Sequence, residues 1–361
     1  MVSSGRMERD VQGKRVFVGL SGGVDSAVSA ALLARAGARV VGVFIKGWYP
    51  PDMPCSWAAD RRDAMRVAAR LNIPFATLDA SEAYKKSVVD YLLAEYAAGR
   101  TPNPDIMCNR DIKFGAFADF AQEHGAHFIA TGHYARVNFT AAGHPLLLRG
   151  KDLGKDQSYF LWAVPAPVLA RTLFPVGSLH KDAVRRYARS FRLPVARKKD
   201  SQGICFLGDV SVEDLLRHEF PVVSGLARDE EGREVGRHQG AILYTLGERV
   251  ALAEASPGPW YVRAKNLNDN VLIVSRTPPH ASVSHVQDIT LSSCNWISDS
   301  SRAREAHYRY HGPRIAGRIT LSDTIDTATF HPTASLPEPA VPGQSLVAYA
   351  GEECVGGGII A

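Results

Sequence analysis

Three short stretches of the sequence contain residue types that could do chemistry. The first is SGGVDS at residues 21–26, where two glycines and two serines follow the apolar run VFVGL. The other two each hold one cysteine, Cys108 in GRTPNPDIMCNRDIKF and Cys205 in KKDSQGICFLG. The chain has no CxxC pair, which argues against a zinc ribbon and leaves each thiol to act singly. These stretches predict a phosphate-binding turn and two separately placed thiols.

The glycine-rich turn has the composition of an anion-binding nest. Gly22 and Gly23 permit a tight turn in which consecutive backbone N–H groups point inward. Ser21 and Ser26 add hydroxyl donors, and the helix expected to follow adds the positive end of its dipole. The string is neither a Walker loop nor a G-x-G-x-x-G turn. It resembles the PP-loop of N-type ATP pyrophosphatases, which implies that ATP is split to AMP and pyrophosphate.

The elements that must position these residues alternate through the first half of the chain. Short apolar runs predict strands, and segments with helical periodicity predict helices, so that a doubly wound parallel sheet is expected. A non-helical loop is expected around Cys108, because two prolines and an Asn-Pro-Asp turn precede it. The expected strands are 16–20, 39–46, 74–79 and 127–131, and the expected helices are 25–36, 58–71, 82–98, 110–124, most of 156–192, and 211–219.

The second half of the chain has a different pattern. LARDEEGREVG and WYVRAKNLNDNVLIVS each predict a β-hairpin, and short alternating runs from about residue 284 predict a small antiparallel barrel or sandwich. We therefore expect an α/β fold with three parts. They are a PP-loop domain over 1–211 with a helical insertion at about 150–195, a small central domain over 212–281, and a C-terminal antiparallel β-barrel over 282–361.

Composition narrows the function classes. The net charge is +5, and eight Lys or Arg residues against one acid lie between Lys181 and Lys199. Such a cluster is typical either of a solvated helix face or of a nucleic-acid contact. Five sparse cysteines favour a reducing compartment, and neither a signal peptide nor a membrane-spanning run is present, so a cytoplasmic location is expected. No resident metal is predicted.

Four motifs carry a closer resemblance. GRTPNPDIMCNRDIKF, ATGHYAR, GKDQSYFL and KKDSQGICFLG occur in this order, and together they resemble the tRNA-uridine 2-sulfurtransferases of bacteria and mitochondria. The similarity is dense to about residue 210 and thinner beyond it. It implies the three-part fold given above, ATP with Mg²⁺ as its counter-ion, the anticodon stem-loop of tRNA as a partner, and a persulfide sulfur donor or relay protein. It also implies that the helical insertion at about 150–195 is tRNA-binding.

The resemblance also implies roles for individual residues. Cys108 matches the nucleophilic cysteine, Cys205 the persulfide carrier, and Asp105 a general base or base-orienting group. The positions matching ATP contacts are Gly19, Leu20, Ser21, Gly22, Gly23, Val24, Asp25, Ser26, Ile45 and Gly132. The positions matching tRNA contacts are Asn103, Pro104, Asp105, His133, Lys155, Asp156, Gln157, Arg309, Tyr310 and Gln344.

Two cysteines make chemical sense for this reaction. The 2-carbonyl of uracil is a poor electrophile, and adenylation turns its oxygen into part of a good leaving group, AMP. The nucleophile is sulfane sulfur, which one thiol carries as a persulfide. Cys108 then either attacks that persulfide to release hydrosulfide or resolves the carrier as a disulfide. Both thiols need exposure and thiolate character, which Arg110, Lys198 and Lys199 are expected to favour.

Other functions remain open from the residues alone. Another adenylating PP-loop enzyme, such as an amidotransferase or a lysidine-type tRNA ligase, would share SGGVDS but would not explain two cysteine motifs. A non-catalytic tRNA-binding or sulfur-relay adaptor would not need the intact Asp25 and Ser26. Taken singly, Cys108 is also compatible with a small buried core residue, and His133 with hydrogen-bonded packing.

Overall fold

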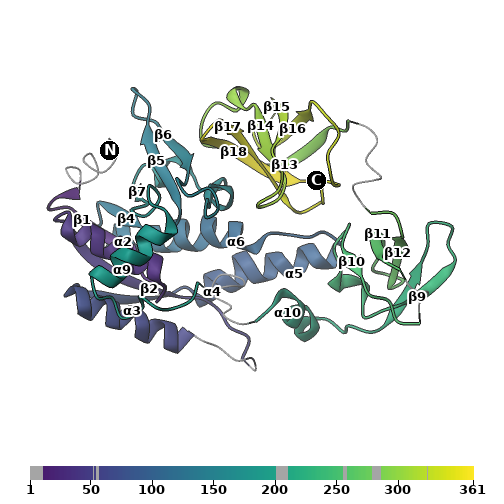
Figure 1. Cartoon of the computed structure of the whole chain (residues 1–361), viewed down its shortest axis with the longest axis horizontal. Coiled ribbons are helices and arrows are strands. Elements are labelled where there is room, and N and C mark those ends of the chain that lie inside the picture. Colours follow the sequence, from purple (N-terminus) through teal and green to yellow (C-terminus); the bar gives the residue numbers. More distant parts are fainter. Residues whose placement is uncertain are drawn as a thin grey trace.

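The computed structural model describes residues 11–51, 53, 57–200, 210–254, 258–278, 286–322 and 324–361. Three sheets and their helices follow one another along the chain (Figure 1). The first sheet lies at one end of the molecule, the small central sheet lies at the other end, and the C-terminal barrel lies beside the hairpin β5–β6. No helix in these ranges is long and apolar enough to cross a membrane.

The first sheet is parallel, with the strand order β3-β2-β1-β4-β7. Its strands are short and apolar because helices cover both faces. Along β1, Val16 and Val18 face the core shared with α2, α3 and α9, whereas Phe17 faces the core shared with α5 and α7. The strands are β1 (Arg15–Gly19), β2 (Arg39–Lys46), β3 (Phe75–Asp79), β4 (Phe128–Ala130) and β7 (Thr172–Leu173).

The helices of this part agree with the predicted segments up to residue 98. Beyond it, the predicted loop around Cys108 is instead helical from Pro104. The helical elements are α2 (Val24–Arg35), α3 (Trp57–Leu71), α4 (Ser81–Tyr84), the π-helix η1 (Lys85–Val89), α5 (Asp90–Ala97), α6 (Pro104–Met107), the π-helix η2 (Cys108–Ala116) and α7 (Phe117–Glu123).

The expectation that 156–192 is mostly helical is wrong. Only α9 (Lys181–Ser190) is a helix of more than one turn there, beside η3 (Ser158–Leu161) and α8 (Ala166–Leu169). Pro165 and Pro175 interrupt the helical pattern, and Thr172–Leu173 instead extends the parallel sheet as β7. The apolar residues of this segment belong to short helical turns and a short strand that pack into the core, and not to long helices.

A hairpin that the sequence reading missed joins the two halves of the molecule. It consists of β5 (Ala135–Phe139) and β6 (Pro145–Arg149), and β6 pairs with β18 of the C-terminal barrel. The first half therefore contributes two strands to the eight-stranded sheet of the second half. This shared sheet fixes the barrel against the PP-loop part.

The C-terminal barrel closes on itself through six antiparallel strands. The order β13-β16-β15-β14-β17-β18 is closed by pairing of β13 with β18, which leaves the six strands without a free edge. The predicted antiparallel barrel is thus confirmed. Its strands are β13 (Ile289–Trp296), β14 (Glu305–His307), β15 (Ile315–Leu321), β16 (Ala328–Pro332), β17 (Ser345–Ala350) and β18 (Glu353–Ile360), with the short η6 (Ser300–Arg302) after β13.

The small central sheet contains both predicted hairpins. Strands β8 and β9 pair antiparallel, as do β11 and β12, and β12 joins the hairpins by pairing parallel with β8. The elements are α10 (Val212–Glu219), β8 (Gly225–Arg228), β9 (Glu234–His238), η4 (Ala241–Leu243), β10 (Arg249–Val250), β11 (Trp260–Asn266) and β12 (Val271–Ser275).

Candidate nucleotide and sulfur-transfer site

The SGGVDS turn leads from the end of β1 into α2. Gly22 has a φ of +75°, and a Cβ there would lie 2.4 Å from the backbone oxygen of Asp60, so that only glycine fits. Gly23 is the N-cap of α2 and has no side chain that could cap the helix, and its own backbone N–H donates to Ser21 Oγ over 3.3 Å. The hydroxyl oxygens of Ser21 and Ser26 lie 3.2 Å apart. The uncapped helix end and the two hydroxyls offer donors to an anion.

The other predicted nucleotide contacts lie around this turn. A Cβ at Gly132 would lie 2.6 Å from the backbone nitrogen of Ser26, and a Cβ at Gly19 would lie 3.8 Å from Ile45 Cδ1. Ile45 is buried in β2, directly beside β1. The structure therefore brings Gly19, Ile45 and Gly132 together at the carboxyl edge of the sheet, where ligands of open α/β sheets bind.

Asp25, in the first turn of α2, has three hydrogen bonds from distant parts of the chain. The Tyr134 hydroxyl donates to its Oδ1 over 2.8 Å, and Lys181 Nζ lies 2.9 Å from Oδ1 and 2.8 Å from Oδ2. Burial and the neighbouring Asp25 carboxylate raise the pKa of Tyr134, which keeps its hydroxyl protonated. Tyr134 was not among the predicted site residues, and no spacing in the sequence links it to Asp25.

Cys108 does not lie on an exposed loop, contrary to the sequence expectation. Asn103 is the N-cap of α6, its Oδ1 accepts from the backbone N–H of Asp105 over 3.2 Å, and Pro104 occupies the first helical position. Asn at the N-cap and Pro at the first position are helix-starting signals, so the Asn-Pro-Asp string begins a helix. Cys108 follows one turn later, is 0% exposed and belongs to the apolar core.

The helix changes its hydrogen-bonding pattern at Cys108. Residues Cys108–Ala116 form a π-helix between α6 and α7. Such segments are rare in proteins and occur often at functional sites. The expected exposure of the Cys108 thiol is wrong for this conformation, and Arg110 pairs with Asp111 over 2.8 Å. Lys198 pairs with Asp60 over 2.8 Å, and its expected effect on Cys205 stays a prediction, because Cys205 lies outside the described residues.

Residues of all three parts of the chain meet just before the Cys108 helix. The backbone N–H of Thr101 donates to the carbonyl of Pro342 over 3.0 Å, and Gln344 Nε2 donates to the carbonyl of Thr101 over 2.8 Å. The Thr101 hydroxyl also lies 3.5 Å from that of Thr245 in the central part. Gln344, a predicted tRNA contact, thus holds the barrel against the segment that leads to Cys108.

Tyr310 connects the barrel to the same helix from another side. Its ring lies 4.4 Å from that of Phe160, and the carbonyl of Phe160 accepts from Asn109 Nδ2 over 3.1 Å. Tyr310 and Arg309 lie in a turn after β14 and not in a strand. Arg309 pairs with Glu338 at 2.9 Å on the surface.

The Lys155, Asp156 and Gln157 side chains each bind within the protein. Lys155 Nζ lies 3.2 Å from Asp200 Oδ2, and Gln157 Oε1 accepts from the Tyr134 backbone N–H over 3.0 Å. Asp156 is buried, and its Oδ1 accepts from the backbone N–H of Gly150 and Ser158. Asp156 therefore orders the loop, while the side chain of Lys155 is 44% exposed.

His133 is buried beside the Cys108 helix. Its Nδ1 lies 2.7 Å from the Thr131 hydroxyl, and its ring packs against Phe114 and Phe174 at centroid distances of 5.8 and 6.0 Å. Burial, with a smaller effect of Lys113, holds its pKa well below the usual value. His133 is therefore a neutral packing residue in this conformation.

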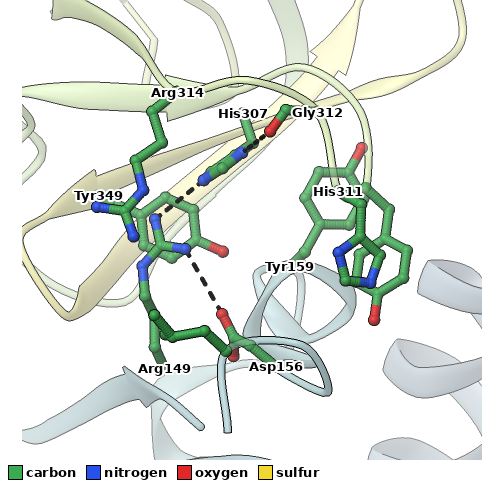
Figure 2. A pocket seen from close by; sticks show the side chains of 10 residues that line it. Arg149, Asp156, Tyr159, His307, His311, Gly312, Arg314 and Tyr349 are labelled. Atoms are coloured by element: carbon green, nitrogen blue, oxygen red, sulfur yellow. Dashed lines mark hydrogen bonds and ion pairs between the residues drawn. The ribbon is translucent and has the colours of Figure 1, made fainter. Parts of the chain in front are cut away.

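A pocket of about 160 Å³ lies where η3 meets the barrel (Figure 2). Arg149 lines it, with its guanidinium 3.7 Å from the centre of the Tyr349 ring and 3.0 Å from His307 Nε2. Burial and the Arg149 charge lower the pKa of His307. The predicted tRNA contacts Asp156 and Tyr310 both line this pocket.

The basic cluster 181–199 is divided between internal and surface roles. Lys181, Arg185 and Lys198 point to carboxylates of the protein. The side chains left exposed on and after α9 are Arg186, Arg189, Arg192, Arg197 and Lys199.

The second predicted thiol, Cys205, lies outside the described residues, as does Cys55. Within the described ranges, no three His, Cys, Asp or Glu side chains come together in a way that could hold a metal ion.

Comparison with known proteins gives the same three-part division in sequence. Residues 14–209 match the tRNA methyl transferase HUP domain, residues 213–276 the tRNA methyl transferase PRC-barrel domain, and residues 286–360 the aminomethyltransferase beta-barrel domain. A HUP domain of the PP-loop type binds ATP. Among solved structures, a 4-thiouridine synthetase in complex with RNA and ATP is 19% identical, with a TM-score of 0.37, and the match covers 56% of this chain and 50% of that one.

Curated relatives match along the whole chain. The tRNA-specific 2-thiouridylase MnmA of Hahella chejuensis is 43% identical over 359 residues, covering 96% of this chain and 97% of the relative. The protein of the same name from Vibrio cholerae serotype O1 is 44% identical over 363 residues, covering 96% of each. With this identity over its full length, the chain belongs to the tRNA-specific 2-thiouridylase family.

Proposed function

We propose that this chain catalyses the ATP-dependent 2-thiolation of the wobble uridine in tRNA, with Cys205 as the persulfide carrier and Cys108 as its partner thiol. One observation carries the assignment: the chain is 43% identical over 96% of its length to a tRNA-specific 2-thiouridylase. The turn geometry at Gly22 and Gly23 supports ATP as the activating substrate.

The reaction has two bond-forming steps. The 2-oxygen of uracil attacks the α-phosphorus of ATP, and pyrophosphate leaves. The terminal sulfur of the Cys205 persulfide then attacks C2, and AMP leaves with the former carbonyl oxygen. Cys108 then attacks Sγ of Cys205, which breaks the S–S bond to the new 2-thiouridine and forms a Cys108–Cys205 disulfide; alternatively, Cys108 attacks Sγ of the persulfide first, and the hydrosulfide that leaves attacks C2 instead. Asp105 orients the uracil or accepts its proton.

The tRNA contacts of this proposal surround the Cys108 helix. Gln344 and Tyr310 hold the barrel to the segments at Thr101 and Phe160, which in turn contact that helix. Because Cys108 is 0% exposed in this conformation, its reaction requires the surrounding contacts to shift so that the thiol becomes accessible. A tRNA that engages the barrel and the helix together would provide the binding energy for that shift.

Phosphate contacts come from the exposed arginines of α9, including Arg186 and Arg189. Such contacts supply affinity that falls with salt and carry no sequence information. Mg²⁺ accompanies ATP as its counter-ion, and a persulfide-bearing protein or relay supplies the sulfur. The sparse cysteines suit the reducing cytoplasm.

Mass spectrometry of tRNA nucleosides tests the assignment. The full chain is incubated with ATP, unmodified tRNA and a persulfide source, and we expect 2-thiouridine to form with one AMP released per thiouridine. Omitting ATP, or replacing Cys205 by Ser, is expected to abolish the product, whereas Cys294→Ser retains it. Formation of thiouridine by the Cys205→Ser variant at the wild-type rate would refute the carrier role, and absence of any product from the wild-type chain would refute the function.

A further inference from the structure

Lys181 differs from the other basic residues of the cluster 181–199 because its side chain pairs with Asp25 of the SGGVDS turn. It is the first residue of α9, a helix that packs against α2. Its Nζ lies 2.8 Å from Asp25 Oδ2 and 2.8 Å from Asp200 Oδ1, and its side chain is 14% exposed. On the same helix, Arg186 and Arg189 are exposed to solvent. Lys181 is therefore turned inward to the loop rather than outward to a partner.

The backbone around Lys181 fixes this orientation. Its N–H donates to Asp152 Oδ2 over 2.9 Å, which anchors the start of α9. Its Nζ also lies 5.7 Å from the centre of the Tyr134 ring, whose hydroxyl donates to the same Asp25. A lysine held at both ends in this way loses little conformational freedom when it binds a further group.

Asp25 by itself would oppose a phosphate. It lies in the first turn of α2, next to the uncapped N–H groups of the turn, and a carboxylate there repels the charge of a bound triphosphate. Lys181 contacts both oxygens of that carboxylate and so offsets the repulsion. An ammonium has three donors, and here they face both oxygens of Asp25 and Oδ1 of Asp200, so a phosphate oxygen takes the place of one of the two Asp25 oxygens when it binds Lys181.

We propose that Lys181 is a positioning residue of the nucleotide site, which binds the β- and γ-phosphates of ATP while Asp25 and Asp200 hold it beside the SGGVDS turn. The proposal rests on the proposed function in that it assumes ATP in this turn. The Asp200 carboxylate forms ion pairs with Lys181, Lys155 and Arg185. It therefore remains paired with Lys155 and Arg185 when Lys181 binds the phosphates. These lysine hydrogen bonds outweigh burial and lower the pKa of Asp200, which remains ionised.

Binding measurements on the full chain test this role. Isothermal titration calorimetry is carried out with α,β-methylene-ATP, inorganic pyrophosphate and AMP as separate probes. We expect Lys181→Met to weaken the first two by about 10- to 100-fold, the loss that follows from removing one charge-assisted hydrogen bond. AMP lacks the β- and γ-phosphates, so its affinity is expected to remain unchanged. Lys181→Arg, which keeps the charge, is expected to restore most of the affinity for pyrophosphate.

Arg185→Met is the matched control, since Arg185 pairs with the same Asp200 carboxylate as Lys181 but, within the described ranges, forms no ion pair with Asp25. It is expected to bind all three probes as the wild-type chain does. Equal losses for AMP and pyrophosphate in Lys181→Met, or no loss for either, would overturn the proposal. If Lys181→Met fails to fold, Lys181→Gln provides the same comparison. A wild-type chain that binds no α,β-methylene-ATP would instead refute the nucleotide site itself.

Discussion

Gly132 is the position at which a single methyl group should damage the nucleotide site most directly. An alanine Cβ there would lie 2.6 Å from the backbone nitrogen of Ser26, 2.9 Å from the carbonyl carbon of Asp25 and 3.1 Å from Asp25 Cβ. Since apolar atoms rest at about 3.5 Å or more, the first turn of α2 has to move away by about 1 Å. That turn carries the N–H groups that are expected to bind phosphate.

Two effects of Gly132→Ala are expected. Overpacking of this kind costs about 1–3 kcal/mol of folding stability. A displacement of about 1 Å at the site costs about 100-fold in activity. We expect the variant to fold, to melt at a lower temperature, and to lose most of its affinity for α,β-methylene-ATP in calorimetry well below its melting temperature.

Gly154→Ala is the matched control for this substitution. The nearest atom to its Cβ would be Asp152 Oδ1 at 3.5 Å, an ordinary contact, so neither stability nor nucleotide affinity should change. A folded Gly132→Ala chain that binds the nucleotide with wild-type affinity would refute the reasoning, because it would mean that the α2 turn either does not move or does not bind phosphate.

Three further predictions follow from other parts of the molecule. Cys108→Ser should abolish thiouridine formation while Cys294→Ser retains it, as measured by nucleoside mass spectrometry, because burial first and then Asp326 raise the pKa of Cys294 to about 12 and leave it an inert thiol. Burial lowers the pKa of Lys265 to about 8, so between about pH 8 and 10.5 the unfolded chain binds more protons than the folded chain, and the free energy of unfolding should rise with pH. Urea titrations should show this rise in the wild-type chain and not in Lys265→Met. The same dependence of the unfolding free energy on pH in both chains would contradict the assignment. Gln344→Ala removes its bond to Thr101 and should lower stability by about 1 kcal/mol in thermal melts, and an unchanged melt would contradict this.

The regular part of the fold was predictable because its signals are local. Continuous apolar runs such as Val40–Ile45 mark strands covered on both faces, and the glycine pair in SGGVDS marks a turn between strand and helix. The C-terminal alternation predicted an antiparallel barrel, and the barrel is present. Periodicity and turn chemistry act within a few residues, so the sequence displays them directly.

Local signals were misread where two interpretations use the same residues. Asn-Pro-Asp before Cys108 is compatible with a turn and with a helix start, and only packing of Ile106, Met107 and Cys108 into the core selects the helix. The hairpin β5–β6 is local, with five paired positions, and was missed all the same; only the pairing of β6 with β18, about 200 residues later in the chain, depends on tertiary packing.

The sequence by itself determined the phosphate turn, the two thiol motifs and the order of the three parts, because each is written in contiguous residues. Only the tertiary structure decided that Lys181 and Tyr134 meet at Asp25, that Gln344 binds the segment before Cys108, and that Cys108 is buried. These contacts join residues separated by more than 100 positions. Which distant side chains become neighbours depends on how the sheet and barrel pack, and no local pattern encodes that packing.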